Sequence, residues 1–330
     1  MRQKILTMSL VLIMVLLFIS CDEGQPSSQE IVDRVNETVD KLNTFGFDLD
    51  MNASINAEAE GEGYEMTFIV SSEGLLDTQN KQTEMELDLD LSVTRIGIIE
   101  QEMSMGIDMG MYLMDNMAYI KMEDKETGPV WGKSEIPEEV WQELSEQMIE
   151  PLDMAKLLTE LLEVTKVDVI GNEVIRGIDC YVLQFNLDID KLWQKSLQLA
   201  EETDEEIPPD FNKESFRDIF NNVSIKQWIA KDTYFITKLE IDADIEIIPE
   251  EMGFTTDEEG LAAELMALDM TINLIVYDHN QPVSIVLPQE AEEAGDMMDV
   301  LTPILMQLLG GGFTDSVDTY TTTITRTQQP

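Results

Sequence analysis

The sequence predicts an α+β protein in which amphipathic helices cover the apolar face of a large antiparallel sheet. Three observations predict this fold class. Long segments alternate apolar and polar residues with a period of two, as strands with one buried face do. Short turn-forming segments separate many of these strands, which is typical of an antiparallel meander. Other segments carry apolar residues three and four positions apart, so helices with one apolar face are available to cover the sheet.

The N-terminal segment has the features of an export signal. Two basic residues precede an apolar run over 6–19 that is too short to favour a membrane span. The run ends in Ser20-Cys21, which resembles the lipobox of bacterial lipoproteins, although Phe18 stands where leucine is usual. In that motif the cysteine receives a diacylglyceryl group and becomes the new N-terminus. We expect Cys21 to be the lipid-attachment residue; the alternatives are an ordinary secretory signal or a spare buried cysteine.

The predicted domain boundaries follow from this segment. We expect a signal peptide over 1–20, a lipidated N-terminus with a short polar tether over 21–28, and a single domain over 29–330. Acidic insertions are expected near 200–210 and 249–260, and no linker divides the chain cleanly.

The only other cysteine is Cys180. If Cys21 is lipidated, Cys180 has no partner, and the domain must be stable without an internal disulfide. Cys180 belongs to the alternating segment 178–185, so we expect it to be a small buried hydrophobic residue.

The first third of the domain predicts one helix followed by five strands. A capping box over 27–30 precedes apolar residues at helical spacing, which predicts a helix of about four turns. Period-two alternation then predicts strands over 45–55, 64–70, 85–93, 103–111 and 117–122.

The remainder of the chain predicts a mixture of helices and strands. Two central helices, each with proline in its first turn, are predicted over 137–148 and 151–164. The acidic segment 249–260 has no periodicity and is expected to be a loop. Further helices are predicted over 189–201, 211–221 and 297–309, and further strands over 166–175, 178–187, 223–230, 234–248, 270–278 and 283–287.

One predicted strand is unusually rich in methionine. Residues 103–111 contain four methionines in nine positions, all on one face of the strand. Methionine is flexible and polarizable, so this face is either a methionine-rich core or the wall of an adaptable apolar cavity. Alternation and helical spacing give the candidate lining residues Phe68, Met85, Leu87, Met103, Met105, Met109 and Met111 from the strands, and Leu158 and Leu161 from a helix.

Charge excludes one class of partner. The formal net charge is −47, and it becomes more negative when the two basic residues of the signal are removed. Such a surface repels nucleic acid and disfavours direct docking on anionic lipid headgroups. The hydrophobic content of 43% is normal for a folded domain, so global disorder is not expected.

No arrangement of residues indicates catalysis. The only histidine is His279, in a polar turn where an exposed surface residue is expected. The sequence contains no Gly-x-Ser-x-Gly motif, no phosphate-binding glycine loop and no cysteine–histidine ligand set. Paired aspartates two positions apart share the solvent face of a strand, and none has the spacing of a calcium loop. We therefore expect no enzyme activity, no catalytic residue, no metal site and no cofactor.

Three segments of the second half resemble the LolA-like and LppX/LprG-type bacterial lipoproteins. They are residues 167–183 (VDVIGNEVIRGIDCYVL), 228–239 (WIAKDTYFITKL) and 275–288 (IVYDHNQPVSIVLP). The order of signal, lipobox, opening helix, strands, central helices and strands also resembles this family, so the similarity extends over most of 27–290. These are patterns of strand and turn rather than catalytic signatures.

The resemblance implies a strongly curved antiparallel sheet, an unclosed half-barrel, with helices over its concave face. Members hold acyl chains or lipoprotein anchors between sheet and helices, and they are not enzymes. It therefore implies an extracytoplasmic cell-membrane lipoprotein that binds an apolar lipid or acyl chain and is anchored at its N-terminus. The alternative is a ligand-free interaction or envelope-sensing module with an unidentified protein partner. The helix over 297–309 would plug the cavity, cap it or face the membrane.

Overall fold

The computed structural model describes residues 26–38, 41–59, 62–96, 101–124, 128–137, 165–203, 212–220, 222–247 and 265–306. The helices are α2 (Ser28–Thr38), α5 (Ile189–Thr203), α6 (Lys213–Ile219), the 3-10 helix η2 (Gln289–Glu293) and α7 (Met297–Met306). The strands are β1 (Thr44–Ala59), β2 (Glu62–Asp77), β3 (Gln82–Ile96), β4 (Gln101–Met114), β5 (Met117–Asp124), β6 (Gly128–Glu135), β7 (Thr165–Ile175), β8 (Ile178–Leu187), β9 (Asn222–Ala230), β10 (Ile236–Ile247), β11 (Leu265–Tyr277) and β12 (Gly295–Asp296).

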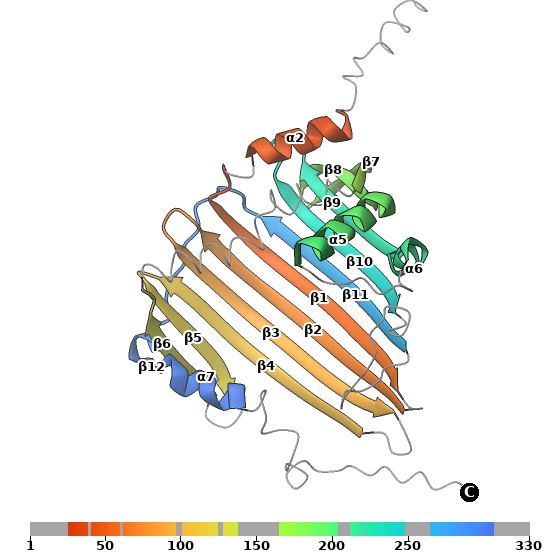
Figure 1. Ribbon diagram of the computed structural model, residues 1–330. Helices are drawn as coiled ribbons and strands as arrows, with labels where there is room; N and C mark the ends of the chain where they lie inside the picture. The colour runs from red at the N-terminus through yellow and green to blue at the C-terminus, as the bar shows by residue number, and fades with distance from the viewer. Residues whose placement is uncertain are drawn as a thin grey trace, which may run out of the picture.

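All twelve described strands belong to one open sheet (Figure 1). The strand order is β12-β6-β5-β4-β3-β2-β1-β11-β10-β9-β8-β7, and the two end strands do not pair with each other. Neighbours are antiparallel except for the short parallel pair of β12 with β6. The predicted fold class, an open antiparallel sheet with helices packed on it, is confirmed.

Two meanders meet at a single seam. Strands β1–β6 pair with their neighbours in sequence, as do β7–β11. The seam joins β1 to β11, with Gly46 opposite Tyr277 at one end and Glu58 opposite Leu265 at the other. Its partners are separated by more of the chain than any local turn connects, so alternation alone does not specify the seam.

One side chain of the turn between β7 and β8, Arg176, reinforces this seam on the outer face. Arg176 forms an ion pair with Asp48 of β1, and its guanidinium lies 4.0 Å from the centre of the Tyr277 ring of β11. The Tyr277 hydroxyl donates a hydrogen bond to Asp48 at 3.0 Å. Burial and this hydrogen bond raise the pKa of Tyr277. One arginine therefore ties a distant hairpin to both strands of the seam.

Alternation separates an apolar inner face from a polar outer face. The register aligns Ile241, Ile272, Met51, Val70, Leu89 and Ile107 in one row across six strands. Because directly opposite residues of a sheet share a face, this row defines the inner face. The adjacent row on the other side carries Glu240, Asn273, Asp50, Ser71, Asp88 and Asp108.

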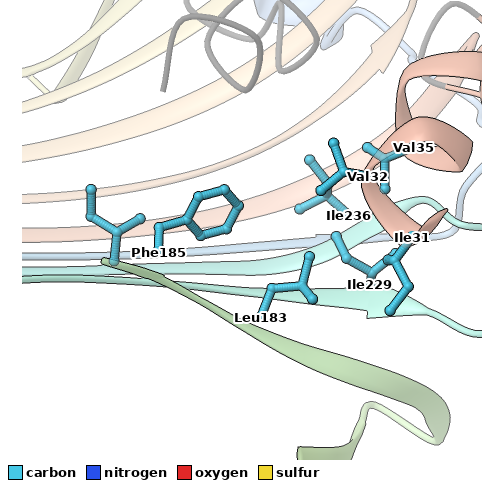
Figure 2. Close-up of a cluster of buried hydrophobic side chains, with 8 residues drawn as sticks. Ile31, Val32, Val35, Leu183, Phe185, Ile229 and Ile236 are labelled. Atoms are coloured by element: carbon cyan, nitrogen blue, oxygen red, sulfur yellow. The ribbon is translucent and has the colours of Figure 1, made fainter. Parts of the chain in front are cut away.

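Helix α2 covers the inner face at the β8–β10 end of the sheet. Its side chains Ile31, Val32 and Val35 pack against Leu183, Phe185, Ile225, Ile229 and Ile236 (Figure 2). At most 2% of the surface of each of the three helical residues is exposed. The Ser27 hydroxyl accepts a hydrogen bond from the Glu30 N–H at 3.2 Å, which is the N-cap part of the predicted capping box. The described helix has 11 residues, about one turn fewer than predicted.

Two further groups cover other parts of the sheet. In the centre, five side chains from both sides of the seam form a buried cluster: Phe45, Phe47, Leu76, Leu274 and Val276. At the opposite end, α7 packs on β6, where a Cβ on Gly132 would lie 2.8 Å from the Met297 Cα. Gly132 is opposite Ile120, which is opposite Met111, so α7 lies on the inner face. This helix was expected to plug the cavity, cap it or face the membrane. Its described part packs on β6 at the inner face of the sheet.

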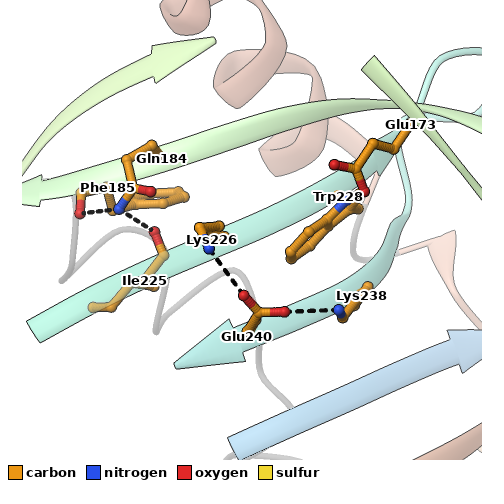
Figure 3. Close-up of polar contacts among 8 residues, drawn as sticks. All are labelled: Glu173, Gln184, Phe185, Ile225, Lys226, Trp228, Lys238 and Glu240. Carbon is orange, nitrogen blue, oxygen red and sulfur yellow. Dashed lines mark hydrogen bonds and ion pairs between the residues drawn. The ribbon is translucent and has the colours of Figure 1, made fainter. Parts of the chain in front are cut away.

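The outer face of β8–β10 carries a polar cluster in which each charge has a partner (Figure 3). The Trp228 indole donates a hydrogen bond to Glu173 at 2.8 Å, and the Lys238 ammonium lies 4.3 Å from the centre of the Trp228 ring. Glu240 accepts hydrogen bonds from Lys238 at 2.8 Å and Lys226 at 3.0 Å, which together lower its pKa. This cluster fixes the positions of neighbouring strands and offers no unpaired charge to a ligand.

Most predicted elements are confirmed within the described residues, but one strand was missed and one predicted strand is wrong. Strand β6 was not predicted because its two glycines and a proline interrupt the alternation. The predicted strand over 283–287 is not part of the sheet. The segment does alternate in burial, because Ile285 is buried and Val286 is 68% exposed. Its alternation reflects burial of one side without a partner strand. The predicted segments 1–20, 138–148, 151–164 and 249–260, with Cys21, lie outside the described residues.

Candidate functional site

The structure places the predicted lining residues of the strands on one face. Register sets Leu87 opposite Met109 and Met85 opposite Met111. Phe68 of β2 and Met105 of β4 both lie opposite Leu91 of β3, one on each side. Met103 belongs to β4 and is opposite Val93. The helix-side candidates Leu158 and Leu161 lie outside the described residues.

The centre of this face is less buried than its margins. Several apolar residues of β2, β3 and β4 on this face are half-buried and belong to none of the buried clusters of the described residues; we call nine of them the methionine face, and Val93, opposite Met66, lies at its edge. Met85 and Met111 lie at its margin, where they pack against neighbouring buried clusters. The methionine face consists of Met66, Phe68, Val70, Leu87, Leu89, Leu91, Met105, Ile107 and Met109.

Sequence reasoning missed five members of this set. They fall in the predicted alternating strands, but alternation gives only the face of a residue and not its distance from the covering helices. The register supplied the missing information by aligning Val70, Leu89 and Ile107 in one row. The missed residues are Met66, Val70, Leu89, Leu91 and Ile107.

The methionine face offers apolar contact rather than reactive groups. Its nine members carry no titratable side chain. Within the described ranges, no group of three or more histidine, cysteine, aspartate or glutamate side chains is arranged to hold a metal ion. Such a face stabilises a ligand by removing apolar surface from water, at about 25 cal/mol per Å². Methionine and leucine side chains can adjust to chains of different shape.

Cys180 and His279 lie away from this face. Cys180 is fully buried, as predicted, and its sulfur lies 3.1 Å from the Thr237 hydroxyl. Burial raises the pKa of the Cys180 thiol. The prediction that His279 is exposed is wrong. Its ring is half-buried against Phe235, 3.0 Å from the Ile236 carbonyl oxygen, and burial lowers its pKa.

Behind the methionine face, two aspartates of the outer face oppose each other directly. Asp88 of β3 is in register with Asp108 of β4. A hydrogen bond with Asp108 and burial raise the pKa of Asp88, and the neighbouring carboxylates raise it further. Like charges in directly opposite positions of a sheet are destabilising. The polar side of this region therefore carries like-charge repulsion between Asp88 and Asp108 at neutral pH.

Replacing Asp108 with asparagine is expected to raise the free energy of unfolding at pH 7 by roughly 0.2–1 kcal/mol. Since folding raises the pKa of Asp88, the folded state binds this proton more tightly than the unfolded chain does. Stability from the pair therefore falls as the pH rises through about 4 and upward. Urea unfolding at pH 3 and pH 7 measures the difference, which should be small at pH 3.

Asp242→Asn is the matched control, because Asp242 lies opposite Ser224 and Thr271, neither of them charged. An equal gain in both variants at pH 7 would show that general charge reduction, rather than the Asp88–Asp108 pair, produces the effect.

The described architecture defines the class of the protein. It is an α+β protein with an open antiparallel sheet, helices on the inner face and a half-buried apolar region between them. The chain belongs to the family described as "Family of unknown function (DUF6612)", whose model matches residues 27–295. No curated protein sequence matches the chain. No helix in the described ranges is both long enough and apolar enough to cross a membrane.

Solved structures similar to this chain include three from the group that the sequence resembles. LprF from Mycobacterium bovis is 10% identical, over 80% of this chain and 99% of that chain, with a TM-score of 0.35. LppX from Mycobacterium tuberculosis is 13% identical, over 79% and 100%, with a TM-score of 0.33. A LolA superfamily protein from Nitrosomonas europaea is 10% identical, over 81% and 97%, with a TM-score of 0.21. These structures are what the chain is similar to, and the similarity carries no information about a ligand.

Proposed function

We propose that the protein binds an apolar lipid or acyl chain on the methionine face. One observation carries this proposal: nine apolar side chains are half-buried in the centre of a face whose two ends are covered by α2 and α7. Each methylene group of a ligand buried there contributes about 0.8 kcal/mol. Met66, Met105 and Met109 suit a ligand class defined by its apolar chain rather than by one rigid shape.

Membrane attachment belongs to the same proposal. The acidic outer face disfavours adsorption to an anionic bilayer, so proximity to lipid requires a separate anchor. A diacylglyceryl group on Cys21 would supply this anchor outside the cytoplasm, and the intact mass of the protein purified from membranes tests for it.

A ligand-free interaction or envelope-sensing module is the second candidate. Its support is that the chain's own side chains already fill the β8–β10 end, the region of the β1–β11 seam and the β4–β5 end of the inner face. If other residues of the chain fill the methionine face in the same way, no ligand is needed.

Native mass spectrometry of the domain from Asp22 onward, expressed in a lipid-rich host, separates the two candidates. We expect a co-purifying mass that organic extraction recovers as lipid. Met105→Glu and Met109→Glu are expected to remove it, because a buried unpaired carboxylate is costly beside an acyl chain. The matched control is Ile69→Glu, since Ile69 is 43% exposed on the outer face opposite Asn52 and Asp90.

Three outcomes count against lipid binding. The first is a clean apo mass with no uptake of added fatty acid or phospholipid. The second is loss of lipid from Ile69→Glu to the same extent as from Met105→Glu. The third is full lipid retention in folded Met105→Gln and Met109→Gln, which replace the glutamate variants if circular dichroism shows that the latter are unfolded and which are otherwise expected to retain less lipid.

A further inference from the structure

Strand β4 extends beyond its neighbour β5, as Figure 1 shows. Strand β4 pairs with β3 along residues 101–113, but it pairs with β5 only from Met109 to Met114. Among the described residues, no strand pairs with the other edge of 101–108. An unpaired strand edge presents backbone N–H and C=O groups with which a further strand can form hydrogen bonds.

Charge accounts for the end of the pairing between β5 and β4, although β5 itself continues to Asp124 beside β6. Met122 is the last residue of β5 in register with β4, where it opposes Met109. Continuing the ladder would bring Glu123 beside Asp108, and opposed carboxylates destabilise a sheet. Glu123 instead forms an ion pair with Lys121 at 2.9 Å. The free edge begins where pairing with β5 would add a second negative charge.

The outer side of the free edge is strongly acidic. Asp108 lies on the edge strand and shares a hydrogen bond with Asp88. Asp90 lies over Gly106, because a Cβ on this glycine would be only 2.9 Å from the Asp90 carboxylate. The carboxylates of β3 thus reach across the small residues of β4 toward the open edge, where Ser104, Gly106 and Asp108 are exposed.

The part of β4 that does have a neighbour shows which charge suits this surface. Lys121 of β5 lies opposite Gly110, which lies opposite Glu86 of β3. Burial raises the pKa of Glu86, and the nearby Lys121 lowers it. The pKa of Asp88 is raised by its hydrogen bond with Asp108, by burial and by neighbouring carboxylates, with no cation among the described residues to lower it. A cation two residues further along the same side of an added strand would therefore relieve the repulsion that β5 leaves.

We propose that the edge of β4 over 101–108 accepts an extended segment of a partner protein as an additional strand. The segment alternates apolar residues with lysine or arginine. Its apolar side chains continue the inner face beside Met105 and Ile107, and its basic side chains lie beside Gly106 and Asp108 on the outer face. A second copy of this chain fits poorly, because its own β4 would bring another Asp108 to the acidic row. The proposal is independent of lipid binding.

The probe is a labelled seven-residue peptide, acetyl-Lys-Val-Lys-Val-Lys-Val-Lys-amide, titrated by fluorescence anisotropy at low salt. The same peptide with glutamate in place of lysine is expected not to bind. Two further peptides carry N-methyl groups on either all lysines or all valines. The N–H groups of alternate residues point to opposite edges of a strand, so only one of the two methylated peptides should lose binding, by about tenfold or more.

Two variants of the protein locate the bound peptide. Ser104→Lys places a cation on the free edge and is expected to weaken binding about tenfold, because it replaces charge attraction with repulsion. Asn52→Lys adds the same charge on the exposed outer face of β1, between β2 and β11, and is expected to change binding by less than about twofold.

Each other result overturns the proposal. Equal binding of the two methylated peptides, or equal weakening by Ser104→Lys and Asn52→Lys, would mean adsorption of a cation to an acidic surface. A dimer of the unliganded protein in light scattering, dissociated by Ser104→Lys but not by Asn52→Lys, would mean that a second copy occupies the edge. No binding of the lysine peptide at submillimolar concentration would mean that the edge does not accept such a segment.

Discussion

Replacing Phe185 with alanine is expected to lower the free energy of unfolding by about 3–5 kcal/mol. Phe185 is fully buried on β8, and it belongs to the cluster that joins α2 to β8, β9 and β10 (Figure 2). Truncating the ring removes apolar contact and leaves a cavity that a sheet with fixed strand spacing fills only in part. Urea unfolding followed by circular dichroism measures the loss.

The control for this variant is Val174→Ala on β7. Val174 is 62% exposed, so its truncation is expected to change stability by less than about 0.5 kcal/mol. A loss below about 1 kcal/mol in Phe185→Ala would contradict a tightly packed contact between α2 and the sheet.

Replacing Gly74 with alanine is expected to cost about 1–3 kcal/mol. A Cβ at this position would lie 2.5 Å from the Glu84 carbonyl oxygen and 2.7 Å from the Phe47 ring. The backbone oxygen cannot rotate away, and Phe47 is held in the buried central cluster, so either the ring or β3 must move. The midpoint of urea unfolding reports the cost.

Gly171→Ala is the comparison for Gly74→Ala. Gly171 belongs to β7, and no atom lies within 4 Å of the position that its Cβ would take. Its replacement should leave stability unchanged or raise it by up to about 1 kcal/mol, since alanine restricts the unfolded chain. If both alanine variants lose the same stability, the loss does not come from the contact with Phe47.

The sequence predicted the strands well where one face is buried and the alternation is long. The runs through Phe47, Phe68 and Leu89 are confirmed as parts of β1, β2 and β3. Strand β6 escaped prediction because its position depends on Gly132, whose missing side chain lets α7 approach. A strand whose residues are small so that a helix can pack closely on it shows little alternation of apolar and polar residues.

The candidate site was predicted by face but not by location. Met85, Met111 and Met109 were all predicted from the same period-two alternation. Met85 and Met111 nevertheless lie at the margin of the methionine face, where they contact buried clusters. Leu89 was missed although it occupies the centre of a row. Only the pairing register and the positions of α2 and α7 separate these cases, and both depend on residues distant in sequence.

The seam between β1 and β11 has a consequence for how the chain folds. Pairing of Glu58 with Leu265 closes a long loop of the chain, and every other pair in the seam closes a longer loop. Loop-closure entropy grows slowly with length, by about 0.6 kcal/mol for each doubling, so the long connection costs little equilibrium stability. Its cost is time, because non-local pairing slows the search for the native state. Until β11 docks, the apolar rows of both meanders end at open edges, and the chain is prone to aggregation during that interval.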